Sequence, residues 1–342
     1  MDIDVGLDTH QLPYEAQRNL HRAAAKLGFG RIWTTAGQDP FLVCALRWSD
    51  SLDVVPGGIG VGIGVATVQS RSPIAFATSA AMLSRLTGGR FILGIGSGSI
   101  YSSETRRQWG IEEKPLATVR AYVNLVRSFL AGEKVIYRSK DFNYDGAELA
   151  GSPQATPIYL GALGPEMLRL AGETADGVVL SWVTAERLEW ARERIAEGAA
   201  KANRDPASIR IATNVRVSVD DDVSSARRAL AAAMYSYVVP PAGAIHAMVY
   251  RPHMERAGFT RGFEELDRLV ARGLSREQIL EEFPEELLQG FGYYGPASGA
   301  AAALRRHAGS ADAVIVRVVP SGGSAEGAAR AMEACAPALV AS

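Results

Sequence analysis

Eight short apolar segments recur along the chain, and a segment with helical spacing follows each of them. β-branched residues dominate the short segments, which favours buried parallel strands. Eight strand–helix pairs without a low-complexity linker predict an α/β fold, a (β/α)8 or TIM barrel, as one domain over residues 1–342. The predicted strands are Asp2–Thr9, Arg31–Ala36, Ile59–Val68, Phe91–Gly96, Pro157–Leu160, Val178–Trp182, Ile209–Val219 and Ala313–Val319.

One region does not follow the strand–helix repeat. Residues 238–296 contain Pro240, Pro241, several short helical patterns and an aromatic cluster that begins at Phe291. A segment of this length is too long for a plain loop. We therefore expect a helical insertion before the last strand.

A glycine series from Gly94 to Gly98 raises a competing fold, the doubly wound nucleotide-binding sheet. In that fold the glycines open a helix that follows the first strand. Here they lie inside and just past the predicted strand, and polar residues follow them. The number of strand–helix pairs therefore favours the barrel.

Charge and cysteine content narrow the function. The 36 basic and 37 acidic residues give a net charge of −1, which offers no attraction for nucleic acid or an anionic membrane and leaves a small molecule as the expected partner. Cys44 and Cys335 lie far apart, and the histidines lack ligand spacing, so we expect neither a disulfide scaffold nor a metal site. An acidic N-terminus and the lack of a long apolar run predict a cytoplasmic protein.

The carboxyl ends of the predicted strands are where a barrel gathers its functional loops. These loops are rich in glycine, serine, threonine and apolar residues and poor in catalytic carboxylates and histidines. Such a surface suits a flat cofactor that supplies its own chemistry. Asp8 ends the first strand and fits either a functional acid or a helix cap, whereas Trp33 and Trp182 are expected to pack in the barrel.

The stretch from Pro157 to Gly177 reads as a strand, a glycine-containing turn and a helix. Gly161 and Gly164 let the backbone approach a ligand closely, and Pro165 suits the first turn of a helix. The free N–H groups at such a helix start favour an anion. These residues also fit an ordinary tight turn without a ligand. Because the turn follows the fifth of eight predicted strands, we predict that the N–H groups of Ala162–Gly164 face a cofactor phosphate.

Three segments carry a family likeness: GRFILGIGSG (Gly89–Gly98), PLATVRAYVNLVRSFLAGEK (Pro115–Lys134) and PIYLGALGPEMLRLAGETADG (Pro157–Gly177). They resemble the luciferase-like (bacterial luciferase) superfamily and, within it, methylenetetrahydromethanopterin reductases and related oxidoreductases that use the deazaflavin coenzyme F420. The resemblance runs over nearly the whole chain. It implies a TIM barrel with an insertion, assembled as a homodimer or a larger homo-oligomer.

The resemblance also implies roles for single residues. The third strand of relatives has a bulge with a non-prolyl cis peptide that supports the ring, which corresponds to Gly64 and Val65. Asp8 matches an acidic residue near the site of hydride transfer, and Thr35 is the second catalytic candidate. The implied cofactor-binding residues are Gly64, Val65 and Ala66 under the ring, Ser97 and Gly98 at the ring or ribityl chain, Gly161, Ala162, Leu163 and Gly164 at the phosphate, and Gly177 and Val178 closing the phosphate pocket.

The chain departs from the F420-dependent pattern after the second strand. Many relatives have an Asp-His pair there, and this chain has Ala36 and Gly37 in its place. Thr35, Gln38 and Asp39 are the residues available to substitute for it. This departure leaves both F420 and FMN open as the cofactor.

Four functions are consistent with these observations. The first is an oxidoreductase that transfers a hydride between coenzyme F420 and an organic substrate, similar to methylenetetrahydromethanopterin reductase. The alternatives are an FMN-dependent luciferase-like monooxygenase, a non-catalytic flavin-binding protein, and an unrelated barrel enzyme that binds phosphate. The divergent loops and the insertion would determine the substrate.

Overall fold

The computed structural model describes residues 1–35, 37–151, 153–239 and 245–341. The chain forms two compact units, each described here by itself. The first unit comprises residues 1–30, 181–190 and 213–342, and the second comprises residues 31–180 and 191–212. Ala36, Pro240 and Pro241 lie outside the described residues.

Parallel strands form the centre of the second unit, in the order β2, β3, β5, β8, β9. Every residue of β3 and β5 is buried, as expected for parallel strands covered on both faces. β3 is followed by the two-residue strand β4 (Ala66–Thr67), which pairs with β5. The main strands are β2 (Arg31–Thr34), β3 (Gly60–Ile63), β5 (Phe91–Gly96), β8 (Ile158–Gly161) and β9 (Gly177–Ser181).

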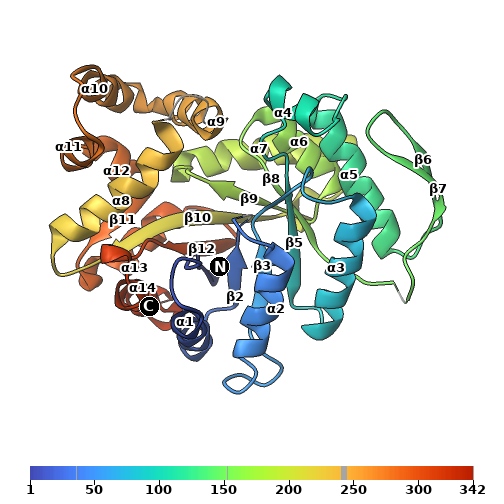
Figure 1. Cartoon of the computed structure of the whole chain (residues 1–342), viewed down its shortest axis with the longest axis horizontal. Helices are drawn as coiled ribbons and strands as arrows, with labels where there is room; N and C mark the ends of the chain where they lie inside the picture. Colours follow the sequence, from blue (N-terminus) through green and yellow to red (C-terminus); the bar gives the residue numbers. More distant parts are fainter. Residues whose placement is uncertain (36, 152, 240–244, 342) are drawn as a thin grey trace. The chain divides into compact units, whose positions relative to one another are not determined.

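Proline is the first residue of four helices in the second unit, where its fixed φ suits the first helical position. Edge-to-face ring contacts of 5.1 Å between Phe41 and Phe76 and 5.2 Å between Phe76 and Tyr122 join α2, α3 and α5, which lie beside β3 and β5 (Figure 1). The four helices that begin with proline are α2 (Pro40–Asp50), α3 (Pro73–Leu86), α5 (Pro115–Leu130) and α6 (Pro165–Thr174). Two other helices in this part of the chain are α4 (Ser103–Gln108) and α7 (Ala185–Lys201).

The sheet of the first unit has the order β11, β10, β12, β1. β1 (Asp2–Gly6) and β12 (Ala313–Val318) pair in parallel from end to end. The other strands are β10 (Arg210–Val219) and β11 (Gly292–Gly295). The helices outside the insertion are α1 (Tyr14–Lys26), α8 (Val223–Val238), α13 (Ala297–Ala308), α14 (Ala325–Ala334) and α15 (Pro337–Val340).

Along the chain, the parallel strands β1, β2, β3, β5, β8, β9, β10 and β12 are each followed by a helix. This is the element order of a (β/α)8 barrel, and it agrees with the eight predicted strand–helix pairs. Among the described residues, no helix is both long and apolar enough to span a membrane. Both cysteines are buried and free.

The predicted helical insertion is wrong in one respect, because it also contains a strand. It holds α9 (Ile245–Met254), α10 (Thr260–Ala271), α11 (Arg276–Glu281) and α12 (Glu285–Phe291), which gather near α8 (Figure 1). The next residues, Gly292–Gly295, form β11 and pair in parallel with Arg216–Val219 of β10. The aromatic pair inside this strand therefore extends the sheet instead of ending the helical segment.

Three smaller expectations are also corrected. The third predicted strand is interrupted between Ile63 and Ala66. Residues 133–156, without a predicted strand, contain an antiparallel pair, β6 (Val135–Arg138) and β7 (Asn143–Ala147). The small-residue pattern from Ala325 to Leu339 predicts a single helix, but α14 ends at Ala334 and α15 starts at Pro337, since proline cannot continue a helix.

Candidate cofactor site

The break between β3 and β4 lies at the carboxyl end of the third barrel strand. The Gly64–Val65 peptide bond is cis, as the resemblance implied for these two residues. The Gly64 N–H donates to the Thr34 carbonyl oxygen at 2.7 Å. Beyond the break, Ala66 and Thr67 pair with Ile95 and Gly96 of β5. Gly64, Val65 and Ala66 therefore lie where β2, β3 and β5 end together.

Glycines from two neighbouring strands make room for the Val65 side chain. A Cβ at Gly96 would overlap a Val65 methyl group, and one at Gly161 would lie 3.2 Å from both Val65 methyl carbons. A Cβ at Gly94 would overlap the carbonyl oxygen of Ile63. A larger residue at Gly94 or Gly96 would force its neighbours to move, and one at Gly161 would be in tight contact with Val65. The glycine series that suggested a nucleotide-binding fold thus serves to admit the bulge around Val65.

Trp33 packs beneath this bulge. Its indole is buried, and a Cβ at Gly62 or Gly64 would lie 2.8 or 3.0 Å from ring atoms. The Arg47 guanidinium donates to the Trp33 carbonyl oxygen at 2.7 Å. The structure therefore bears out the expectation that Trp33 packs within the protein.

A polar group lies beside the end of β5. Ser97 is buried, and Gly98 has a φ of 54°, a left-handed conformation that glycine adopts without strain. A Cβ at Gly98 would lie 2.7 Å from Nε2 of Gln69. The Gln69 amide donates to the Ser99 hydroxyl at 3.2 Å, while its Oε1 is buried without a partner among the described residues. An orphaned buried acceptor calls for a donor, and sequence reasoning had not singled out Gln69.

The turn after β8 leaves its backbone donors unpaired. Within the described part of the chain, the N–H groups of Ala162, Leu163 and Gly164 have no hydrogen-bond acceptor. A Cβ at Gly164 would meet no atom within 4 Å, so the turn is not packed shut. α6 begins at Pro165, which adds the positive end of its helix dipole. This turn has the donors and the open space that an anion requires.

Two predicted phosphate-pocket residues lie on the neighbouring strand β9. The register pairs Gly177 with Tyr159 and Val178 with Leu160, the residue before Gly161. A Cβ at Gly177 would lie about 2.5 Å from the Tyr159 ring, which explains the glycine by packing. That Gly177 and Val178 close the phosphate pocket stays a prediction.

The loop after β2 brings Thr35 close to the bulge, because Thr34 and Ile63 are partners in the sheet. Of the residues available to replace the Asp-His pair, Asp39 is already engaged. Its carboxylate accepts from the N–H of Phe41 at the start of α2 and forms an ion pair with Arg71. Asp39 therefore has a structural role, and Thr35 stays the catalytic candidate of this loop.

Asp8 belongs to the first unit, after β1. Its carboxylate lies 2.9 Å from the guanidinium of Arg317 and is 38% exposed, whereas the Arg317 side chain is almost buried. Asp8 is therefore an ion-paired residue and not a helix cap, since α1 begins after Pro13. Sequence reasoning missed Arg317, although a basic residue inside an apolar strand is a signal that could have found it.

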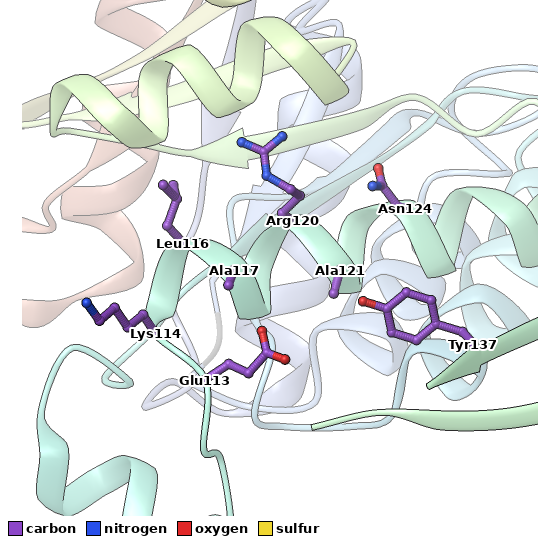
Figure 2. A pocket seen from close by; sticks show the side chains of 8 residues that line it. All are labelled: Glu113, Lys114, Leu116, Ala117, Arg120, Ala121, Asn124 and Tyr137. Atoms are coloured by element: carbon purple, nitrogen blue, oxygen red, sulfur yellow. The ribbon is translucent and has the colours of Figure 1, made fainter. Parts of the chain in front are cut away.

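The sites brought together in the second unit are thus Thr35, Gly64–Ala66, Ser97–Gly98 and Gly161–Gly164, at the ends of β2, β3, β5 and β8. These residues provide a packed apolar surface, hydroxyl groups and backbone N–H donors. Among the described residues, no group of side chains could hold a metal ion. A surface pocket of about 440 Å³ lies elsewhere in this unit, along α5 and β6, where Arg120, Asn124 and Tyr137 line it (Figure 2). None of the predicted site residues lines that pocket.

The chain is similar to known proteins in both sequence and structure. A family model described as luciferase-like monooxygenase matches residues 1–312. The chain is 35% identical over 212 residues to the 5,10-methylenetetrahydromethanopterin reductase of Methanolobus tindarius, an alignment that covers 61% of this chain and 63% of the relative. The chain thus spans a little under two thirds of that relative's length.

Solved structures confirm the fold class. The coenzyme F420-dependent tetrahydromethanopterin reductase of Methanopyrus kandleri superposes with a TM-score of 0.75 at 23% identity, covering 97% of both chains. An FMN complex of a type II Baeyer-Villiger monooxygenase from Pseudomonas putida superposes with a TM-score of 0.64 at 15% identity, covering 100% of this chain and 98% of the other. The chain therefore has the (β/α)8 barrel fold, as predicted.

Proposed function

Since the chain belongs to the luciferase-like monooxygenase family, we propose that it is an oxidoreductase that transfers a hydride between coenzyme F420 and an organic substrate. The observation that carries the proposal is the turn after β8, where the N–H groups of Ala162–Gly164 have no acceptor among the described residues and a Cβ at Gly164 would meet no atom within 4 Å. The name of one relative, the F420-dependent glucose-6-phosphate dehydrogenase of Rhodococcus erythropolis, supports the choice of deazaflavin.

The residues of the second unit suit each part of such a cofactor. Ala162, Leu163 and Gly164 would hold the phosphate through their N–H groups. Val65, wedged against Gly96 and Gly161, would support the ring by packing. Gln69 would accept a hydrogen bond from a ring N–H through its unpartnered Oε1. When bound, the deazaflavin supplies the hydride chemistry.

The protein would mainly position the cofactor and the substrate, and would contribute little acid–base chemistry. Thr35 is the candidate that would orient a polar group of the substrate next to the bulge. Packed side chains such as Trp33 exclude water from the space below the bulge. Fixed geometry and exclusion of water are the contributions that proximity catalysis needs.

An FMN-dependent monooxygenase is the second candidate. It is favoured by Ala36 and Gly37, which stand where many F420-dependent relatives have an Asp-His pair. The same residues would bind the ring and the phosphate of FMN. The two candidates therefore differ in the ring that the site prefers.

A titration with four compounds tests both the ring and the phosphate. Binding of F420 and FMN to the purified protein is compared with binding of the corresponding deazaflavin and riboflavin, which lack the phosphate. We expect F420 to bind at least tenfold more tightly than FMN, and each phosphate-bearing compound at least tenfold more tightly than its phosphate-free partner, since charge-assisted hydrogen bonds contribute on this order. Tighter binding of FMN would favour the monooxygenase, and no binding of any of the four would exclude a flavin function.

A further inference from the structure

Two arginines are buried in the first unit, and one of them has no acidic partner. Arg216 on β10 is 5% exposed and Arg317 on β12 is 7% exposed. Arg317 pairs with Asp8, but no carboxylate of the described residues forms an ion pair with Arg216. Burial lowers the pKa of the Arg216 guanidinium, Tyr237 partly opposes this shift, and the charge of Arg317 adds to it. A buried cation without an anion is costly.

The Arg216 guanidinium is nevertheless held in one orientation. Its central carbon lies 3.4 Å from the ring centroid of Trp182 and 5.0 Å from that of Tyr237. One nitrogen donates to the Ser181 hydroxyl at 3.2 Å. Tyr237 also forms a side-chain hydrogen bond with Arg216. Stacking on Trp182 and the bonds to Ser181 and Tyr237 therefore fix the plane of the guanidinium.

Trp182 adds an unusual backbone and an unsatisfied donor. Its φ is 57°, which a bulky side chain rarely adopts. The His253 ring donates to the Trp182 carbonyl oxygen at 3.1 Å, and Tyr237 packs edge-on at 5.3 Å. The indole N–H is fully buried and has no acceptor among the described residues. Strained residues with unsatisfied donors are typical of functional sites.

Another polar group without a hydrogen-bond partner lies on β10, the strand that carries Arg216. The Ser218 hydroxyl is buried without a partner in the described part of the chain, and Ser218 shares a face of β10 with Arg216, two residues away. The groups shown around Trp182 are thus the Arg216 guanidinium, the indole N–H itself and the His253 ring, with the Ser181 hydroxyl bound to Arg216, and none of them is a carboxylate. Donors without a carboxylate match a ligand that carries only acceptors and a negative charge.

We propose that Arg216 and the indole N–H of Trp182 bind an oxyanion, a carboxylate or phosphate group, of the organic substrate. A single anion bound to both groups would offset the buried charge of Arg216 and would also accept a hydrogen bond from the indole N–H of Trp182. The assignment to the substrate rests on the proposed oxidoreductase function. The anion site itself rests only on residues of the first unit.

Binding of inorganic phosphate to the purified, cofactor-free protein tests the site. Calorimetric titrations at constant ionic strength compare the wild type with Arg216→Gln and Trp182→Phe. We expect the dissociation constant to rise at least tenfold in Arg216→Gln, and several-fold in Trp182→Phe, which keeps a stacking ring but loses the N–H donor. Arg330→Gln is the matched control, because Arg330 is a half-exposed cation of the same unit that pairs with Asp220.

The outcomes separate this proposal from the function proposed above. Phosphate binding that is unchanged in both site variants would overturn the anion site, even if F420 binds well. Phosphate binding that weakens in both, with Arg330→Gln unaffected, supports the anion site even if no flavin binds. Thermal unfolding identifies a misfolded variant, and Trp182→Phe decides the question if Arg216→Gln does not fold. A phosphate held only at the turn after β8 would be retained in both variants, and would count against the proposal.

Discussion

Arg317 reaches Asp8 by lying across Gly6. The two strands pair so that Gly6 of β1 faces Arg317 of β12. A Cβ at Gly6 would lie 2.8 Å from Cδ of Arg317 and would overlap its guanidinium, whose other nitrogen lies 2.9 Å from the Asp8 carboxylate. Gly6 is therefore what allows this ion pair to form.

This relationship predicts that Gly6→Ala displaces Arg317 from Asp8. Crowding of this kind costs about 1–3 kcal/mol of unfolding free energy, whereas Asp8→Asn, which only removes the partly exposed ion pair, should cost about 1 kcal/mol. Urea unfolding of both single variants and the double variant measures the coupling. The loss in the double variant should be smaller than the sum of the single losses, and additive losses would contradict the displacement.

The thiols of this protein should be unreactive in the native state. Burial raises the pKa of both Cys44 and Cys335 to about 12, and only the thiolate attacks disulfide reagents. At pH 8 we expect an aromatic disulfide reagent to modify neither cysteine in the folded protein and both after unfolding in guanidinium. Cys44→Ser and Cys335→Ser assign any signal to one thiol, and rapid native modification of either would show that it is accessible.

The strands could be predicted where local pattern decides them. Phe91–Gly96 was predicted with the bounds that β5 has, because a buried parallel strand reads as a short, continuous apolar run. The turn after β8 was predicted equally well, because glycine and proline set its local geometry. Such features depend on residues close in sequence.

Features that depend on distant partners could not be predicted. β11 is only four residues long, and its pairing partner on β10 lies over seventy residues earlier. The crowding of Gly94 and Gly96 by Ile63 and Val65 likewise appears only once β3 and β5 are side by side. The stacking of Arg216 on Trp182 joins residues that lie over thirty positions apart in the sequence, so no local pattern reveals it.

The stability of the first unit should fall in mild acid because of His253. Burial lowers the pKa of His253 to about 4, and the nearby Arg187 acts in the same direction. Between the ordinary value of 6.5 and about 4, the unfolded chain binds a proton that the folded protein does not. Stability is therefore complete above about pH 6.5 and falls as the pH drops to 4, by an amount on the order of 3 kcal/mol.

Unfolding by urea between pH 4 and 8 measures this slope. His253→Gln removes the titrating group and should flatten the curve. His307→Gln is the control for the second buried histidine, whose pKa burial also lowers. A wild-type slope that persists unchanged in His253→Gln would contradict the assignment.

Two glycines of the candidate cofactor site should respond to alanine in opposite ways. At Gly96 a methyl group would overlap Val65, so Gly96→Ala should lower the unfolding free energy by about 1–3 kcal/mol. At Gly164 the φ of −89° suits any residue, and a methyl group would meet open space, so Gly164→Ala should cost less than about 1 kcal/mol as a change of helix cap. Cofactor binding should nevertheless weaken at least tenfold in Gly164→Ala, because the methyl group would narrow the approach of the phosphate to the free N–H groups. Urea unfolding and a cofactor titration on each variant separate the two effects. If Gly164→Ala binds F420 and FMN as the wild type does, the phosphate does not lie at this turn, because no loss of folding could have masked the result.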